Sequence, residues 1–279
     1  MANLKHAIKQ GIVALKAKNI QPVMQAVGDE SLLKGKTALV VGGTGGIGRA
    51  VAKAFLKNGA NVVIAGTRRA KVDKVAVELG EKCAGVVVNL AEPETFSRVV
   101  DEAVAFYGPI DILVNSAGVH TEHVSMGGFL DFTVEEYDRI LDINLRGVYF
   151  MVQSVAQRMI SDKVSNGHIL IVSSSAGNEP AWSPYRVSKW GLKGITEGMA
   201  SALVPHGIVV NAIAPGSTAT PLLGIEEGDS ISAEDNGLGR FAMPEEIAEF
   251  AVMLASPMGD MVVGDTLYVS GGRGVCDIR

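Results

Sequence analysis

A glycine-rich turn between an apolar strand and an apolar helix constrains the fold of this chain more than any other segment. Residues 36–41 form a β-branched apolar run that stops at glycines, which predicts a buried strand. Gly42-Gly43-Thr44-Gly45-Gly46-Ile47-Gly48 follows, and apolar residues at helical spacing begin at Ala50. A strand, a glycine turn and a helix N-terminus together present backbone N–H groups to a pyrophosphate. This segment therefore predicts a dinucleotide-binding α/β domain.

Strands and helices alternate along the rest of the chain. Further apolar strands are predicted at 61–66, 84–90, 111–114, 168–173, 208–214 and 267–269. Helices are predicted at 71–79, 93–106, 133–159, 184–203 and from 244 onward. Near-continuous apolar strands that alternate with helices are typical of a parallel sheet covered on both faces. We expect one doubly wound α/β domain over residues 35–279.

The first 34 residues lie outside this domain. Residues 1–17 are basic and weakly amphipathic, and lysines interrupt their apolar positions, so they do not make a convincing signal peptide. An organelle transit segment is an alternative, although the serine and arginine typical of one are missing. We expect residues 1–34 to form a helical extension that packs on the domain or on a neighbouring subunit.

Composition excludes several classes of function. The net charge of −5 and the lack of an arginine-rich stripe offer no basic surface for nucleic acid. No apolar run reaches the ~20 residues that span a bilayer. Cys83 and Cys276 match no metal or redox spacing, and His120 and His123 around Glu122 are more typical of a surface loop or substrate wall. We expect a cytoplasmic protein with reduced thiols, no membrane contact and no catalytic metal.

The end of the second predicted strand bears on the choice of cofactor. Nucleotide-binding sheets that prefer NAD usually carry an acid there for the ribose hydroxyls. Here Thr67-Arg68-Arg69 follows the strand, so there is no carboxylate to repel a 2′-phosphate and two guanidiniums could pair with it. NADP is therefore favoured over NAD. The alternative is that both arginines lie on a solvated loop.

Tyr185 and Lys189 are the candidate reactive pair. Ser183 can cap a helix and Pro184 suits its first turn, so side chains four residues apart would share a face. A tyrosine titrates near ~10, and lowering its pKa by ~3 units needs about 4 kcal/mol of differential interaction with a group such as an ammonium. The same spacing occurs by chance on many helices, so the pair alone does not establish chemistry.

Taken in order, the motifs resemble the short-chain dehydrogenase/reductase family from about residue 36 to residue 272. The matching residues are Gly42, Gly46 and Gly48, Asn115-Ser116-Ala117-Gly118, Asn144, Ser174, Tyr185 with Lys189, and Asn211-Ala212-Ile213-Ala214-Pro215-Gly216. Each motif alone is weak, whereas this order and spacing are specific. The resemblance implies a Rossmann fold, a homodimer or homotetramer, and hydride transfer with a nicotinamide cofactor.

The resemblance implies a role for each catalytic residue. Ser174 would hydrogen-bond the substrate carbonyl, and Tyr185 would give its oxygen a proton in reduction or accept one in oxidation. Lys189 would lower the pKa of Tyr185 and hold the nicotinamide ribose. Asn144 would position a water that passes protons from Lys189, or would be a buried amide that satisfies its neighbours. The stretch from Ser174 to Tyr185 is shorter than is usual in the family, so Ser173 is the alternative to Ser174.

The resemblance also implies the cofactor contacts. Asn89 would approach the adenine, Asn115 would support the sheet and the ribose side, and Thr220 would lie near the cofactor or simply cap its loop. The residues expected to bind the cofactor are Gly42, Thr44, Gly45, Gly46, Ile47, Gly48, Thr67, Arg68, Arg69, Asn89, Leu90, Asn115, Ala117, Gly118, Tyr185, Lys189, Pro215, Gly216, Thr218 and Thr220.

Residues 222–239 bear on the substrate, because relatives form a mobile lid there. The acids of this segment are Glu226, Glu227, Asp229, Glu234 and Asp235. A carboxylate-rich lid is a poor match for a polyanionic carrier. We therefore expect an NADP-dependent oxidoreductase for a small ketone, aldehyde or secondary alcohol. The alternatives are a reductase of 3-oxoacyl chains on acyl carrier protein or coenzyme A, and a non-catalytic nucleotide-sensing or scaffolding protein.

Overall fold

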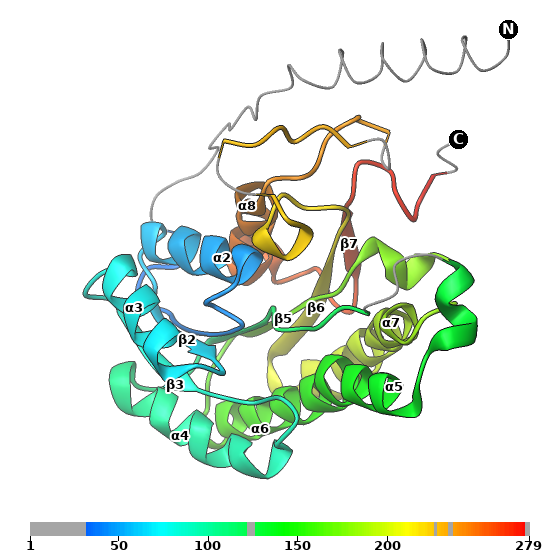
Figure 1. The fold of residues 1–279 in the computed structure, drawn as a ribbon. Helices are drawn as coiled ribbons and strands as arrows, with labels where there is room; N and C mark the ends of the chain where they lie inside the picture. The colour runs from blue at the N-terminus through cyan, green and yellow to red at the C-terminus, as the bar shows by residue number, and fades with distance from the viewer. Residues whose placement is uncertain (1–31, 122–125, 226–227, 234–236, 277–279) are drawn as a thin grey trace, which may run out of the picture.

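The computed structural model describes residues 32–121, 126–225, 228–233 and 237–276 (Figure 1). Seven parallel strands form one sheet in the order β3-β2-β1-β4-β5-β6-β7. The strands are β1 (Thr37–Val41), β2 (Asn61–Gly66), β3 (Cys83–Val87), β4 (Ile112–Asn115), β5 (Gly167–Val172), β6 (Ile208–Pro215) and β7 (Thr266–Val269). The predicted doubly wound α/β fold is confirmed.

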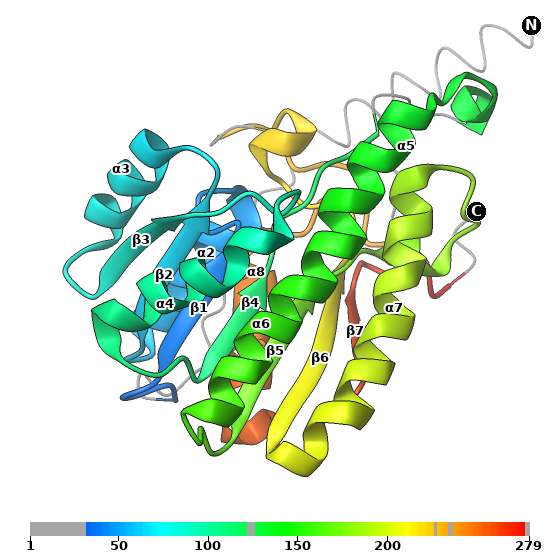
Figure 2. The same ribbon diagram turned by 90° about the horizontal axis from the view of Figure 1, so that it is seen from below.

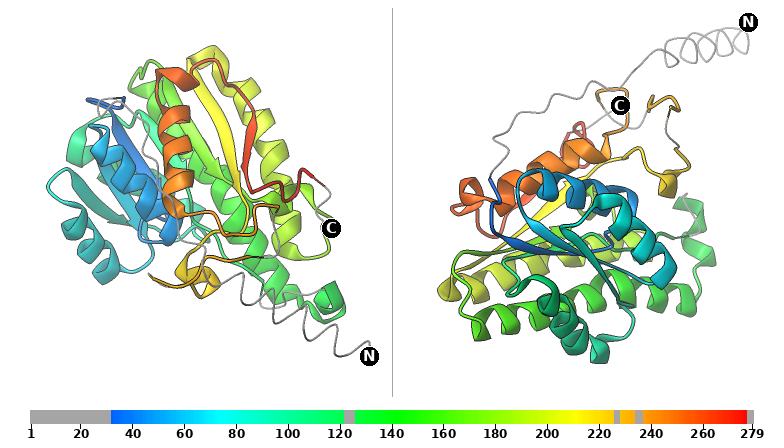
Figure 3. Two further views of the ribbon diagram at one scale, coloured as in Figure 1. Left: turned by 90° about the horizontal axis from the view of Figure 1, so that it is seen from above. Right: turned by 90° about the vertical axis from the view of Figure 1, so that its left-hand side faces the viewer.

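Helices cover both faces of this sheet. They are α2 (Gly46–Lys57), α3 (Arg69–Leu79), α4 (Phe96–Tyr107), α5 (Val134–Leu141), α6 (Val148–Ser161), α7 (Pro184–Leu203) and α8 (Pro244–Ala255). Helices α4, α6 and α7 bury apolar side chains against one face, which Figure 2 shows from the helix side. Helices α2, α3 and α8 pack on the other face, seen from above in Figure 3. Because both faces are covered, β1, β4, β5 and β6 are buried along their whole length.

The long helix predicted over residues 133–159 forms as a continuous helical segment that contains a π-helical turn. Thr133 caps α5, as its sequence predicts, by accepting a hydrogen bond from the Glu136 N–H. A π-helical turn, Asp142–Gly147, then separates α5 from α6. Gly147 packs so closely on the Leu90 backbone that a Cβ there would collide with the Leu90 carbonyl oxygen. The wider turn fits this close approach, and single π-turns inside helices are frequent at functional sites.

The strand order reverses between β1 and β4. From β1 the chain continues to β2 and β3 on one side, and from β4 it continues to β5, β6 and β7 on the other side. Ligands of such sheets bind at the carboxyl ends of the strands at this point. The extension predicted at residues 1–34 lies almost entirely outside the described residues. Within the described ranges, none of the helices is both long and apolar enough to cross a membrane.

Candidate active site

The glycine turn after β1 forms a cradle that side chains would fill. Gly42 has φ 84°, and a Cβ there would lie 2.6 Å from the Ala117 backbone nitrogen. A Cβ at Gly48 would collide with the Gly42 carbonyl oxygen. Gly45 precedes α2 and supplies no side chain to cap it. The turn therefore keeps the backbone N–H groups of a helix N-terminus open to an anionic ligand.

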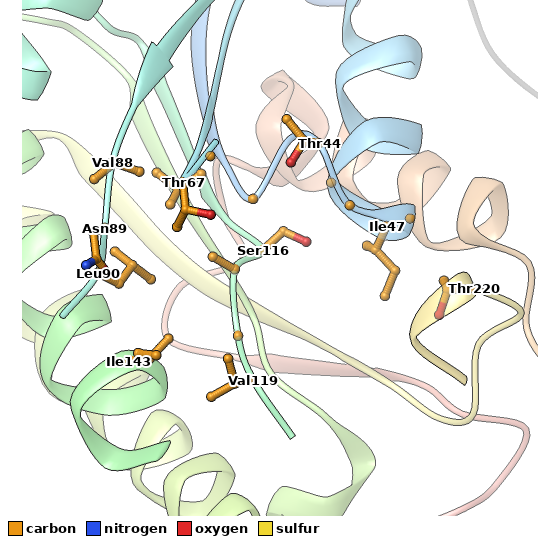
Figure 4. Close-up of a pocket in the computed structure, with 18 residues that line it drawn as sticks. Thr44, Ile47, Thr67, Val88, Asn89, Leu90, Ser116, Val119, Ile143 and Thr220 are labelled. Atoms are coloured by element: carbon orange, nitrogen blue, oxygen red, sulfur yellow. The ribbon is translucent and has the colours of Figure 1, made fainter. Parts of the chain in front are cut away.

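A cavity of about 370 Å³ lies beside this cradle at the carboxyl ends of β1, β2 and β4 (Figure 4). Most of the predicted cofactor residues line it: Gly42, Thr44, Gly45, Gly46, Ile47, Gly48, Thr67, Asn89, Leu90, Ala117, Gly118 and Thr220. Val88, Val119 and Ile143 add apolar side chains that were not predicted from the sequence. Open backbone N–H groups next to an apolar slot suit the phosphates and the rings of a dinucleotide.

The other predicted cofactor residues do not line this cavity. Arg68 is exposed, and the described part of the chain gives its guanidinium no hydrogen bond or ion pair. Arg69 pairs with Asp73 at 3.5 Å and donates to the Gly85 carbonyl at 3.4 Å. Two arginines adjacent in sequence therefore differ, because only Arg69 has its guanidinium engaged within the described chain.

Two predicted amides have contrasting surroundings. Asn89 Nδ2 donates to Glu92 at 2.7 Å, and its oxygen accepts from the Ala91 N–H at 3.1 Å, so it shapes the loop after β3. Asn115 is 1% exposed, and neither polar atom of its side chain has a partner among the described residues. A buried amide without a partner is costly unless a ligand or water meets it.

Loop residues after β6 support the cavity by local hydrogen bonds. Thr218 is buried and donates through Oγ1 to the Gly216 carbonyl at 3.0 Å. Thr220 donates to the Thr218 carbonyl at 3.3 Å, and its methyl carbon fills the space that a Cβ at Gly46 would need. Pro215 ends β6 one residue before Gly216. These contacts match the loop-capping alternative for Thr220 while keeping its side chain at the cavity.

Helix α7 places Tyr185 and Lys189 next to Ser174. Ser183 accepts from the Arg186 N–H at 3.3 Å and Pro184 begins the helix, as the sequence predicts. The ammonium of Lys189 lies 5.5 Å from the centroid of the Tyr185 ring and donates to the Val172 carbonyl at 3.2 Å. It also borders the cavity, because a Cβ at Gly118 would lie 3.9 Å from it. The Ser174 hydroxyl interacts with the phenol of Tyr185, which favours Ser174 over Ser173.

Burial has the largest effect on both titratable groups of this site. It raises the pKa of Tyr185, while hydrogen bonding with Ser174 and the charges of Arg273 and Arg186 lower it, and the pKa stays above its ordinary value. Burial lowers the pKa of Lys189 to about 8. Burial thus outweighs the groups that lower the pKa of Tyr185, and the lowering of that pKa by Lys189 stays a prediction. The cost of removing the phenolate from water exceeds the stabilisation that its neighbours provide.

Asn144 lies in the π-helical turn and is 1% exposed. Its side chain donates to the Val119 carbonyl at 2.8 Å and accepts from the Val119 N–H at 2.8 Å. A longer contact of 3.3 Å reaches Ser188 Oγ. These contacts are those of the alternative interpretation, a buried amide that satisfies its neighbours. They hold the segment after β4 against α7.

Aromatic rings line the surroundings of Tyr185, among them His120, which fits the substrate-wall interpretation of this residue, and Trp182, which was not predicted from the sequence. The His120 ring lies against the Tyr185 ring with centroids 4.1 Å apart. Trp182 stacks near Phe132 at 6.4 Å, and Arg186 lies 5.2 Å above the Trp182 ring. Glu122 and His123 lie outside the described residues. Within the described ranges no three metal-ligating side chains gather in one place.

The segment predicted as a lid is only partly described. Ile231 is 3% exposed and Ala233 is 7% exposed, so this part of the segment packs on the domain. Asp229 is exposed. The other acids of the segment, Glu226, Glu227, Glu234 and Asp235, lie outside the described residues. Arg240 directly follows the segment and forms a bidentate ion pair with Glu246 at 2.7 Å.

Comparison with known proteins agrees with this geometry. Residues 42–273 match a family model described as "Enoyl-(Acyl carrier protein) reductase". The chain is 34% identical over 251 residues to the 3-oxoacyl-acyl-carrier-protein reductase FabG of Aquifex aeolicus, covering 87% of this chain and 99% of that protein. It is also 34% identical to the human dehydrogenase/reductase SDR family member 4, covering 86% of this chain and 88% of that protein.

Solved structures lead to the same family. A short-chain dehydrogenase/reductase family protein is 34% identical with a TM-score of 0.76, covering 88% of this chain and all of that chain. A short-chain dehydrogenase from Burkholderia cenocepacia, solved in complex with NADP, is 29% identical with a TM-score of 0.77, covering 87% of this chain and 99% of that one. The fold, the glycine cradle and these relatives together show that the chain belongs to the short-chain dehydrogenase/reductase family of oxidoreductases, which use nicotinamide cofactors.

Proposed function

We propose that this chain transfers a hydride between NADP(H) and a small ketone, aldehyde or secondary alcohol, with Tyr185 as the general acid and base. The observation that carries the proposal is the grouping of Ser174, Tyr185 and Lys189 at the edge of the cavity. Three polar groups from two different segments meet there. Such convergence in a cleft is typical of a catalytic site.

Each side chain has a distinct part in the proposed reaction. Tyr185 donates its phenolic proton to the carbonyl oxygen in reduction and takes a proton from the alcohol in oxidation. Ser174 donates a hydrogen bond to the same oxygen and stabilises the charge that develops on it. Lys189, whose pKa burial lowers to about 8, can exchange protons near neutral pH. The bound nicotinamide supplies the hydride in reduction and accepts it in oxidation.

Asn144 completes the proposed site as a positioning residue. Its two hydrogen bonds to the Val119 backbone fix the segment that carries Gly118 into the cavity. Asn144 also contacts Ser188 on α7, the residue before Lys189. The second part of its proposed role is therefore to position a water that passes protons from Lys189. Both parts depend on the amide, so a change to an apolar residue would remove them together.

The preference for NADP rests on the chemistry after β2. Arg68 offers an exposed guanidinium where an acid would favour NAD. Two similar solved structures are described with this cofactor, the Burkholderia cenocepacia enzyme with NADP and the actinorhodin polyketide ketoreductase with NADPH. The ketoreductase is 28% identical to this chain, with a TM-score of 0.77. A 2′-phosphate would meet a positive charge and no nearby carboxylate on this loop.

Reduction of carrier-bound 3-oxoacyl chains is the second candidate function. The similarity to FabG and the description of the matching family model favour it. The acids predicted over residues 222–239 weigh against a polyanionic carrier, and of these the structure shows Asp229 exposed. Turnover of acetoacetyl thioesters faster than that of free ketones would promote this candidate over the first.

We further propose that the chain works in the cytoplasm as a homodimer or homotetramer. Helices α5, α6 and α7 expose large apolar side chains on the described chain, among them Val134, Tyr137, Tyr149 and Trp190. Exposed apolar surface of this kind is typical of a protein–protein contact. Both cysteines are unpaired in the described structure, as expected of a reducing compartment.

A substrate screen with both cofactors tests the proposed function. Absorbance at the nicotinamide band would follow ketones, aldehydes, secondary alcohols and acetoacetyl thioesters, each with NADP(H) and with NAD(H). We expect turnover with NADP(H) that the Tyr185→Phe variant loses. Tight NADPH binding without turnover of any substrate would support the non-catalytic nucleotide-sensing alternative instead.

A further inference from the structure

A charged cluster joins the C-terminal segment, residues 270–276 after β7, to the wall of the site. Arg273 Nε donates to Glu179 Oε1 at 2.8 Å, and Arg186 Nη1 pairs with Glu179 Oε2 at 2.7 Å. The two arginines thus hold opposite oxygens of one carboxylate. Side-chain exposure is 16% for Glu179 and 15% for Arg186, so water screens these charges only partly. Glu179 and Arg273 are 94 residues apart in the sequence.

Neighbouring contacts fix the cluster on both sides. Arg273 Nη1 donates to Ser217 Oγ at 2.9 Å, and Asn178 Nδ2 donates to the Gly274 carbonyl at 2.5 Å. A Cβ at Gly274 would lie 2.6 Å from the Ser175 carbonyl oxygen, so the C-terminal backbone lies directly on the segment after β5. Ser174 is the second residue of that segment. The C-terminal segment is therefore a structural part of the catalytic wall.

The cluster also borders the two segments that carry Ser174 and the phenol of Tyr185, because Glu179 accepts from the Ser175 hydroxyl at 3.4 Å and Arg186 directly follows Tyr185 in α7. The charged and titratable groups around that phenol are Lys189 and Arg186 from α7, Glu179 with the Ser174 hydroxyl from the segment after β5, His120 from the segment after β4, and Arg273 from the C-terminal segment. The positive charges of Arg273 and Arg186 favour the phenolate, and the negative charge of Glu179 opposes it.

We propose that Arg273 is a positioning residue of the active site, which acts with Arg186 through their shared carboxylate Glu179 to set the acidity of Tyr185. The C-terminal segment then contributes to the electrostatic field at Tyr185 together with Lys189. The relevance to catalysis rests on the proposed role of Tyr185 as proton donor. The acidity itself is a property of the folded chain and can be measured without a substrate.

The test is a titration of Tyr185 followed by NMR of protein labelled with 13C at the tyrosine ζ-carbon. The Tyr185→Phe variant identifies the signal by its loss. We expect Arg273→Gln to raise the pKa of Tyr185 by about 0.5–1 unit, since a full charge near a partly buried group shifts a pKa by this order. Glu179→Gln should lower the pKa, and Arg273→Lys, which keeps the charge, should restore it toward the wild-type value.

Arg158→Gln is the matched control. Arg158 has a side-chain exposure of 28%, against 29% for Arg273, and likewise bridges two groups by pairing with Asp101 and with Asp162 at 2.7 Å. It lies near the end of α6, which leads into the amino end of β5, whereas Ser174 follows the carboxyl end of that strand. Its substitution should leave the titration of Tyr185 unchanged.

The sign of the shifts decides the proposal. If Arg273 had only a structural role, Arg273→Gln and Glu179→Gln would shift the pKa of Tyr185 in the same direction, or neither would shift it, as expected for Arg158→Gln. Either result would overturn the proposal. Where the titration midpoint of Tyr185 lies above the pH at which a variant unfolds, the ionised fraction of Tyr185 is compared at one fixed alkaline pH instead. A smaller ionised fraction than in the wild-type protein then means a raised pKa. A substrate screen without turnover would defeat the proposed function but not these shifts.

Discussion

The ammonium of Lys189 donates a hydrogen bond to the Val172 carbonyl at 3.2 Å and lies 5.5 Å from the centroid of the Tyr185 ring. Only 5% of Lys189 is exposed, and burial lowers its pKa to about 8. The folded chain thus holds a cation where water cannot reach it freely. Burying the ammonium costs stability, so we attribute the charge of Lys189 to the function of the site rather than to the stability of the fold.

Lys189→Met should therefore raise stability at neutral pH while removing activity. The lowered pKa, about 8 against an unfolded 10.5, corresponds to about 3 kcal/mol at pH 7, and loss of the hydrogen bond to Val172 reduces the gain to about 1–3 kcal/mol. Urea unfolding at pH 7 measures the free energy of unfolding. A variant less stable than the wild-type protein would show that the ammonium stabilises the fold.

The pH dependence of the same pair of proteins gives an independent test. Between pH 8 and 10.5 the unfolded lysine holds its proton while the folded one has lost it, so the unfolded state binds more protons. The contribution of Lys189 to the free energy of unfolding therefore becomes less unfavourable as pH rises through this window. The stability advantage of Lys189→Met should shrink from pH 8 to pH 10.5. An advantage that stays constant would contradict the lowered pKa.

Gly42→Ala should destabilise the fold and the cofactor site together. The change forces a side chain into a backbone conformation with φ 84° and places its Cβ 2.6 Å from the Ala117 nitrogen. A loss of about 1–3 kcal/mol in the free energy of unfolding is expected from the backbone strain. Gly45→Ala, in the same turn, has φ −92° and meets its nearest neighbour at 3.4 Å, so it should leave stability unchanged or slightly higher. Equal losses for both variants would show that the turn tolerates no side chain for another reason.

Arg68→Ala should weaken NADPH binding by about 10-fold or more and leave NADH binding nearly unchanged, since a charged hydrogen bond to phosphate contributes about 1.5–3 kcal/mol. Arg69→Ala is the matched control, because its guanidinium already pairs with Asp73 and donates to the Gly85 carbonyl. Calorimetric titration of both variants with both cofactors measures the effect. Equal losses for NADPH and NADH would remove the argument for a 2′-phosphate site at Arg68.

Local patterns were enough to predict the fold. The apolar run of β1 ends at glycines in the sequence and at Val41 in the structure, and the strands that follow agree within a few residues. Buried parallel strands are continuous apolar runs in the sequence, so their positions can be predicted without knowing which strands pair with them. The helix predicted across residues 133–159 forms without a break, but the sequence pattern did not predict its π-turn at Asp142–Gly147, where Gly147 packs closely on Leu90.

The site was predictable only where its residues form motifs. The glycine turn and the Tyr185 helix carry their spacing in the sequence, whereas the pairing of Glu179 with Arg273 depends on where the folded C-terminal segment comes to lie. The stacking of His120 on Tyr185 likewise joins two segments that the sheet brings together. The pKa of Tyr185 depends on burial, which a sequence pattern does not specify.

Tyr185→Phe tests the central claim most directly, because it removes the phenolic hydroxyl and keeps the ring that packs against His120. On a substrate that the wild-type enzyme accepts, kcat should fall by about 10²–10⁴-fold, the usual contribution of a general acid. The dissociation constant for the cofactor should stay within about 3-fold, less than the ~1 kcal/mol of one neutral hydrogen bond. A variant that binds the cofactor and keeps the wild-type kcat would contradict the proposed role of Tyr185.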